Sequence, residues 1–133
     1  MTSLKYPVIL AVMLSSATGC AMAADSLMSG SDIKARVIGN TVAGVDEGKP
    51  YQEYYNPNGS IDGVDTEEYG GAWRIDSNRL CTRYESDDEK KGAPAWECSG
   101  VTVKGDQLTW VDGEGEKTEV KLLAGKQLKQ PAP

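Results

Sequence analysis

The chain of 133 residues is long enough for one small domain, and a hydrophobic content of 39% limits the core that it can build. It contains no histidine, which excludes every catalytic or metal site that needs an imidazole. With 20 acidic and 14 basic side chains the net charge is −6, so we expect no nucleic-acid partner.

Residues 1–23 have the organisation of a secretory signal peptide. Lys5 precedes a short apolar run at 7–14, and small residues continue to Ala24. The apolar run is far shorter than the roughly 20 residues that a membrane-spanning helix needs. A buried N-terminal helix is the alternative interpretation of this segment.

Two cleavage sites compete within this segment. The Ala-Met-Ala sequence at 21–23 fits signal-peptidase cleavage before Ala24. The Ala-Thr-Gly-Cys sequence at 17–20 resembles a bacterial lipoprotein box, in which residues 1–19 are removed and Cys20 is lipidated. Ala17 stands where that box usually has leucine, which favours simple secretion. The protein would contact a membrane only if Cys20 carried a lipid.

Residues 24–125 are expected to form a single β-domain that begins with one short helix. Ser31 is a candidate N-cap and Asp32 suits the first helical turn. Ile33 and Val37 fall on one side of this helix, and Gly39 is suited to end it.

Short segments of alternating polarity, separated by turn residues, continue from Asn40 to residue 123. The pattern predicts an all-β fold with about eight antiparallel strands in a meander. Such a meander forms either a small lipocalin-like barrel or a strongly curved sheet. Residues 126–133 are expected to be a flexible tail. The predicted strands span 41–45, 51–55, 60–64, 69–75, 79–85, 95–103, 107–111 and 116–123.

Cys81 and Cys98 remain after removal of the signal peptide, and an even number of cysteines in an exported protein favours a disulfide. The alternatives are a pair of thiolate metal ligands or a redox centre. Both are less consistent with the sequence, which has no C-x-x-C motif and no histidine to complete a metal site.

Aromatic residues are the main candidates for a binding site. Trp73 and Trp110 either fill the core or line a ligand cavity. Tyr54 and Tyr55 are adjacent, so one faces inward and the other outward. We expect ligand or partner contacts among Tyr54, Tyr55, Trp73, Arg74 and Trp110.

Acidic residues gather at 62–68 and at 87–89 but lack the spacing of a calcium-binding loop. Solvated loops are the better interpretation of both clusters. No nucleophile, phosphate-binding or metalloprotease motif occurs. We therefore expect a non-enzymatic protein without a cofactor or a metal, although paired carboxylates leave a hydrolase as a third hypothesis.

The order of several short motifs resembles a family of small exported proteins that are abundant in alphaproteobacteria and largely uncharacterised. The motifs are I-G-N-T-V-x-G at 38–44, Y-Y-x-P-x-G-x-I-x-G at 54–63, Y-x-G-x-W-R-I at 69–75, Leu80-Cys81 and Cys98. The resemblance covers residues 31–125. It implies an envelope protein with a helix, a β-meander and a disulfide, and it assigns no catalytic residue.

The expected function is that of an exported, non-enzymatic cell-envelope domain that binds a small molecule inside the barrel. It would reside in the periplasm or be secreted, or be anchored to a membrane by lipid. Trp73, Leu80, Trp110 and Leu122 would then leave a pocket instead of filling the interior. The alternative is a protein-interaction or inhibitor module with Tyr55 or the Asp87 loop at its contact surface.

Overall fold

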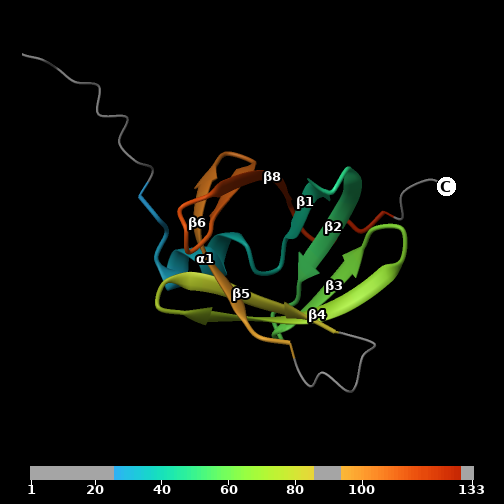
Figure 1. The fold of residues 1–133 in the computed structure, drawn as a ribbon, viewed down its shortest axis with the longest axis horizontal. Coiled ribbons are helices and arrows are strands. Elements are labelled where there is room, and N and C mark those ends of the chain that lie inside the picture. The colour runs from blue at the N-terminus through green and yellow to red at the C-terminus, as the bar shows by residue number, and fades with distance from the viewer. Residues whose placement is uncertain (1–25, 86–93, 130–133) are drawn as a thin grey trace, which may run out of the picture.

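The computed structural model describes residues 26–85 and 94–129, which form a closed antiparallel β-barrel with one short helix (Figure 1). The predicted all-β fold of eight strands and an N-terminal helix is confirmed, and the sheet is closed. No helix within these two ranges is long and apolar enough to cross a membrane. The elements are α1 (Gly30–Arg36), β1 (Thr41–Asp46), β2 (Lys49–Tyr55), β3 (Ser60–Val64), β4 (Glu68–Asp76), β5 (Arg79–Tyr84), β6 (Glu97–Lys104), β7 (Gln107–Val111) and β8 (Lys117–Leu123).

Each strand pairs with the next one in the chain, and β1 pairs with β8 to close the barrel. In this closing pair, Thr41 lies opposite Leu123. Tight turns make the meander possible. In the turn between β4 and β5, Ser77 and Asn78 have φ angles of 51° and 59°. Two consecutive residues with positive φ form the hairpin turn whose twist matches that of the flanking strands.

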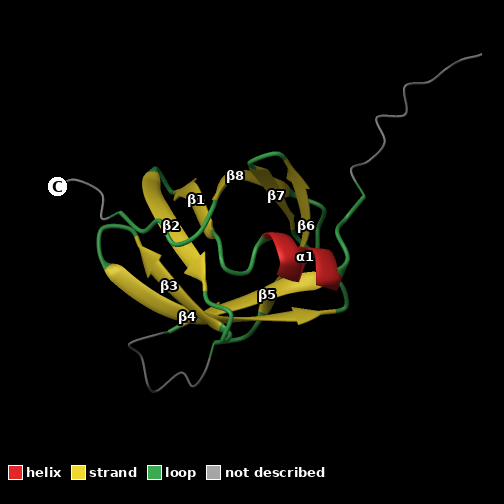
Figure 2. Ribbon diagram, turned by 180° about the vertical axis from the view of Figure 1, so that it is seen from behind, coloured by secondary structure: helices red, strands yellow, loops and turns green. Residues whose placement is uncertain are grey.

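Helix α1 lies beside β5 and closes one end of the barrel (Figure 2). Its N-cap is Ser29, whose hydroxyl accepts a hydrogen bond from the N–H of Asp32, so the helix begins earlier than an N-cap at Ser31 implies. The N–H of Gly30 donates to the Asn78 side chain at 2.8 Å. Ile33 and Val37 are fully buried against the strands, which gives this short helix the tertiary support that it needs.

Apolar side chains form the central cluster of the barrel interior. Trp73 and Trp110 are partly buried and pack against the central cluster. The indole N–H of Trp73 donates to the carbonyl of Asn56 at 2.8 Å. The interior is therefore a packed core, as in other small barrels of eight strands. The central cluster comprises Ile33, Val37, Val42, Tyr55, Ile61, Leu80, Val101, Leu108 and Val120.

The segment after β8 crosses back over the first strand. The buried hydroxyl of Thr41 donates to the carbonyl of Gly125 at 2.6 Å and accepts from the N–H of Gln127 at 2.9 Å. Lys126 lies over the ring of Tyr54 and forms an ion pair with Asp62. These contacts involve the first residues of the segment that the sequence predicts to be a flexible tail.

Candidate functional site

A buried carboxylate, Glu53 on β2, accepts hydrogen bonds from three tyrosine hydroxyls. Tyr55 and Tyr84 donate to Oε2 at 3.0 Å each, and Tyr69 donates to Oε1 at 2.7 Å. Only 6% of Glu53 is exposed. We call these four residues the Glu53 cluster. Because they belong to β2, β4 and β5, the cluster joins non-adjacent strands across the barrel interior.

Glycines opposite the tyrosines make room for this cluster. Tyr69 lies opposite Gly63 in the register of β3 and β4, and Tyr84 lies opposite Gly71 in the register of β4 and β5. A Cβ atom at Gly63 would overlap the ring of Tyr69. Aromatic rings that cover a glycine on the neighbouring strand are a known stabilising device in β-sheets. Each of the two tyrosines is thus paired with a glycine, which has no side chain to displace the ring.

The Glu53 cluster lies toward the end of the barrel opposite α1. Residues Arg79 and Asp76 flank the turn that contacts the helix, whereas Tyr84 and Tyr69 lie near the other ends of the same strands. The rings of Tyr69 and Tyr84 meet edge to face with centroids 5.9 Å apart. Tyr84 is 37% exposed, so this ring forms part of the surface.

Burial dominates the electrostatics of the cluster. Loss of hydration raises the pKa of Glu53, the three hydroxyl donors act in the opposite direction, and the nearby charge of Asp46 raises it further. Burial, together with the charge of Glu53, also raises the pKa values of Tyr69 and Tyr84, and raises that of Tyr51 to about 12. The tyrosines therefore remain protonated donors at neutral pH.

A pocket of about 240 Å³ lies beside Tyr84 at the end of β5. Its wall includes Tyr84 and two charged residues of the same strand end, Arg83 and Glu85. We call this hollow the rim pocket. The described residues that line it are Gly71, Ala72, Arg83, Tyr84, Glu85 and Pro94.

Two arginines stack on one indole beside the rim pocket. The guanidinium of Arg83 lies 4.4 Å from the ring centre of Trp96, and that of Arg74 lies 4.6 Å from it. We call Arg74, Arg83 and Trp96 the arginine–tryptophan stack. Within residues 26–85 and 94–129, no carboxylate forms an ion pair with Arg74 or Arg83.

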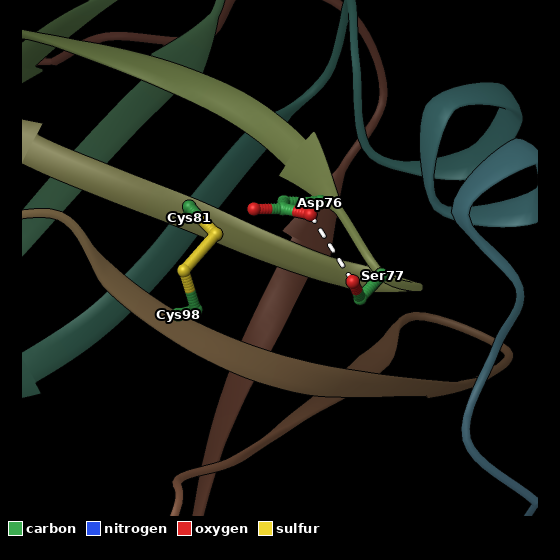
Figure 3. The surroundings of a disulfide bond; sticks show 4 residues. All are labelled: Asp76, Ser77, Cys81 and Cys98. Atoms are coloured by element: carbon green, nitrogen blue, oxygen red, sulfur yellow. Dashed lines mark hydrogen bonds between the residues drawn. A yellow bond between two sulfur atoms is a disulfide. The ribbon is translucent and has the colours of Figure 1, made fainter.

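The disulfide between Cys81 and Cys98 fixes the strands that carry this stack. Figure 3 shows it joining β5 and β6, near the turn that contains Asp76 and Ser77. The two cysteines face each other in the strand register, and Cys81 is fully buried. This crosslink confirms the predicted pairing. Arg83 on β5 and Trp96, which directly precedes β6, each lie two residues from one of these cysteines.

The residues predicted from sequence as contacts occupy different surroundings. Trp73 and Trp110 pack on the core, and Tyr55 is only 1% exposed, which removes it from the surface available to a partner. Tyr54 faces outward beneath Lys126. Arg74 alone of this set belongs to the arginine–tryptophan stack. Cys20, the candidate lipidation site, and the Asp87 loop lie outside the described residues.

Sequence analysis missed Glu53, Tyr69, Tyr84, Arg83 and Trp96. Strand alternation does place Glu53 on the same face as Tyr51 and Tyr55, and this was the available signal. The acidic residues at 62–68, which the sequence analysis singled out, accept local hydrogen bonds. Asp62 accepts from Asn56, and Asp65 accepts from the N–H of Glu67.

No group of three or more histidine, cysteine, aspartate or glutamate residues within the described part of the chain is placed to hold a metal ion. Comparison of the chain with known protein families, with curated proteins and with solved structures gives no match.

Proposed function

We propose that this protein is an exported binding domain that takes a small molecule with a single carboxylate at the rim pocket. The observation that carries the proposal is the position of Arg83, which lines the rim pocket while its guanidinium stacks on Trp96. The stacking thereby orients the arginine at a concave surface.

Stacking determines what such an arginine can bind. When the flat face of a guanidinium rests on an indole, its N–H groups point outward in the plane, where they match the two oxygens of a carboxylate. Arg74 stacks on the same indole and adds a second positive charge nearby. Glu85 lies in the wall of the same pocket and disfavours ligands with several negative charges.

The size of the pocket limits the ligand further. Its volume of about 240 Å³ is below the range of about 300–1,000 Å³ typical for drug-sized ligands. The barrel interior is filled by the core cluster, so this proposal moves the ligand from the interior to the rim. A compact monocarboxylate with a flat apolar part fits both the charge and the volume.

Calorimetric titration with benzoate and benzamide tests the ligand class, because the two differ mainly in charge. We expect benzoate to bind and benzamide to bind far more weakly. Arg83→Gln should weaken benzoate binding roughly 10- to 100-fold, the range for loss of a hydrogen bond to a charged group. Arg79→Gln is the matched control, since Arg79 lies on the same face of β5 outside the stack.

Equal binding of benzoate and benzamide, or binding of neither, would overturn the proposal. So would an Arg79→Gln effect as large as that of Arg83→Gln, because it would indicate only a general loss of positive charge. Citrate extends the test. We expect it to bind more weakly than benzoate, owing to its repulsion by Glu85.

Export is the second part of the proposal. It is supported by the signal-peptide pattern of residues 1–23 and by the disulfide, which fits an oxidising compartment. Intact mass of the purified protein should give a chain beginning at Ala24, or at an acylated Cys20. An uncut chain with free thiols at Cys81 and Cys98 would contradict export.

A further inference from the structure

We propose that Glu53 is a positioning residue for the rim pocket: it holds the ring of Tyr84, a residue of the pocket wall, and uptake of a proton on Oε2 of Glu53 releases that ring. This inference rests on the proposed function for its consequence in binding. Glu53 itself does not line the pocket. It reaches the wall only through the hydroxyl of Tyr84, which donates to Oε2 at 3.0 Å.

The hydrogen-bond arrangement suits an ionised carboxylate. Both oxygens accept, with Tyr55 and Tyr84 sharing Oε2 and Tyr69 on Oε1. A proton on Oε1 would leave the two bonds to Oε2 in place, whereas a proton on Oε2 competes with the two donors that share this oxygen. At least one tyrosine hydroxyl must then turn away or reverse its role.

The exposure of the three tyrosine side chains determines which of them gives up its hydrogen bond to Glu53. Tyr55 is 1% exposed, so a lost hydrogen bond would leave its hydroxyl buried without a partner, which costs about 1–3 kcal/mol. Tyr69 is half-buried. Tyr84 has the most exposed side chain of the three, and its hydroxyl is the one that water can satisfy with the smallest movement.

Within residues 26–85 and 94–129, no cation acts on Glu53 in place of the hydroxyl donors. β2 contributes Tyr51 and Tyr55, β4 contributes Tyr69, and β5 contributes Tyr84. On the other strands paired with β2, the residues opposite Glu53 are Val42 of β1 and Gly63 of β3. Among the described residues, the charge of Asp46 at the end of β1 raises the pKa of Glu53, and that of Asp65 raises the pKa of Tyr69. Burial and Asp46 favour proton uptake by Glu53, whereas the three hydroxyl donors favour its ionisation.

The first test follows the ring of Tyr84 by NMR in protein labelled with ¹³C-tyrosine, from pH 4 to pH 8, without ligand. We expect the Tyr84 ring signals to move with one titration in the wild-type protein and in Tyr69→Phe. Glu53→Gln should abolish that titration. Glu85→Gln should retain it, which separates Glu53 from the other carboxylate beside Tyr84.

The second test measures benzoate affinity at pH 7. Glu53→Gln and Tyr84→Phe should each weaken binding about fivefold, and the double variant should be no weaker than either, as for coupled residues in contact. Tyr69→Phe, which removes a different hydroxyl from the same carboxylate, is the matched control and should bind like wild type.

The outcomes separate the two proposals. Tyr84 signals that do not titrate, or that titrate equally in Glu53→Gln, would overturn the positioning role. Benzoate binding that is unchanged in Glu53→Gln would do the same while leaving the proposed function intact. Titration of Tyr84 without any benzoate binding would overturn the proposed function alone and leave Glu53 as the residue that holds this ring.

Discussion

Glu53 shows how one residue can depend on its neighbours for its charge. Its carboxylate is held by three hydroxyls, and no lysine or arginine of the described residues shifts its pKa. Hydrogen bonds to neutral donors offset part of the cost of removing a charge from water. Burial remains the larger influence, so the pKa of Glu53 stays above its ordinary value.

This pKa shift predicts an unusual dependence of stability on pH. A carboxyl group whose pKa is higher in the folded than in the unfolded chain takes up its proton earlier in the folded state. Its contribution to stability therefore rises as the pH falls through the folded pKa toward 4.5, and is lost as the pH rises. Urea unfolding of wild type and Glu53→Gln should show a difference that shifts in favour of wild type on acidification from pH 8 to pH 5. A shift in the opposite direction would contradict a raised pKa.

Gly63 is a second residue whose identity is set by a neighbour. Alanine at this position would place a Cβ against the ring of Tyr69. Overpacking of this kind costs about 1–3 kcal/mol, and we expect Gly63→Ala to lower the free energy of unfolding by that amount in chemical denaturation. Gly113→Ala is the control, because a Cβ at Gly113 meets no atom within 4 Å and its φ is not positive. Equal stability of the two variants would show that the ring moves aside freely.

Among the elements, β5 and β6 depend on a covalent link. The two strands pair only from Leu80↔Ser99 to Thr82↔Glu97, and this paired length is shorter than that of most neighbouring strands. The disulfide lies in the middle of this register. It therefore compensates for a short hydrogen-bonded ladder at the place where Arg83 and Trp96 must be brought together.

Replacement of both cysteines by alanine tests this link. The sequence separation of 17 residues corresponds to a loss of about 3 kcal/mol in the loop-entropy treatment. We expect that loss in urea unfolding, together with weaker benzoate binding, since the stack would no longer be fixed. Reduction of the wild-type disulfide should reproduce both effects. If the destabilised variant bound benzoate as well as the wild type, the arginine–tryptophan stack would not depend on the disulfide.

The sequence was informative about elements because turns and alternation are local signals. Asn-Gly at 58–59 and Ser-Asn at 77–78 mark turns, and all eight strands were predicted within a few residues of their bounds. The start of α1 was missed because Ser29 and Ser31 are equally good caps by composition, and only tertiary contacts such as that of Gly30 with Asn78 distinguish them.

The candidate site was mostly invisible in the sequence for a different reason. Alternation groups Glu53 with Tyr51 and Tyr55, but it does not tell which strands lie across the interior. The contacts of Glu53 with Tyr69 and Tyr84 depend on the register of three strands. Arg83 and Trp96 are brought together by the pairing of β5 with β6, which sequence spacing does not reveal.

At the scale of the whole molecule, charge is unevenly distributed. The protein is acidic, yet three of its four arginines, Arg74, Arg79 and Arg83, lie on β4 and β5. The two that stack on Trp96 sit beside the rim pocket. Arginines concentrated in one part of an acidic protein favour the binding of anions there over the rest of its surface.

The C-terminal segment contributes to the stability of the whole molecule, since it joins the end of the chain to the first strand. Truncation after Ala124 removes both hydrogen-bond partners of the buried Thr41 hydroxyl. We expect a loss of about 1–3 kcal/mol in the free energy of unfolding, the cost of a buried polar group without a partner. Truncation after Lys129 keeps both contacts and is the control. Equal stability of the two shortened chains would mean that water replaces these contacts fully.

The pairing of β1 with β8 also determines when the barrel can close. Strands that are neighbours in the barrel but lie at opposite ends of the sequence meet only when both are available. Because a polypeptide is synthesised from its amino end, the sheet cannot be completed until residue 123 has been added. The circular strand order therefore leaves the barrel unclosed until its last strand is present.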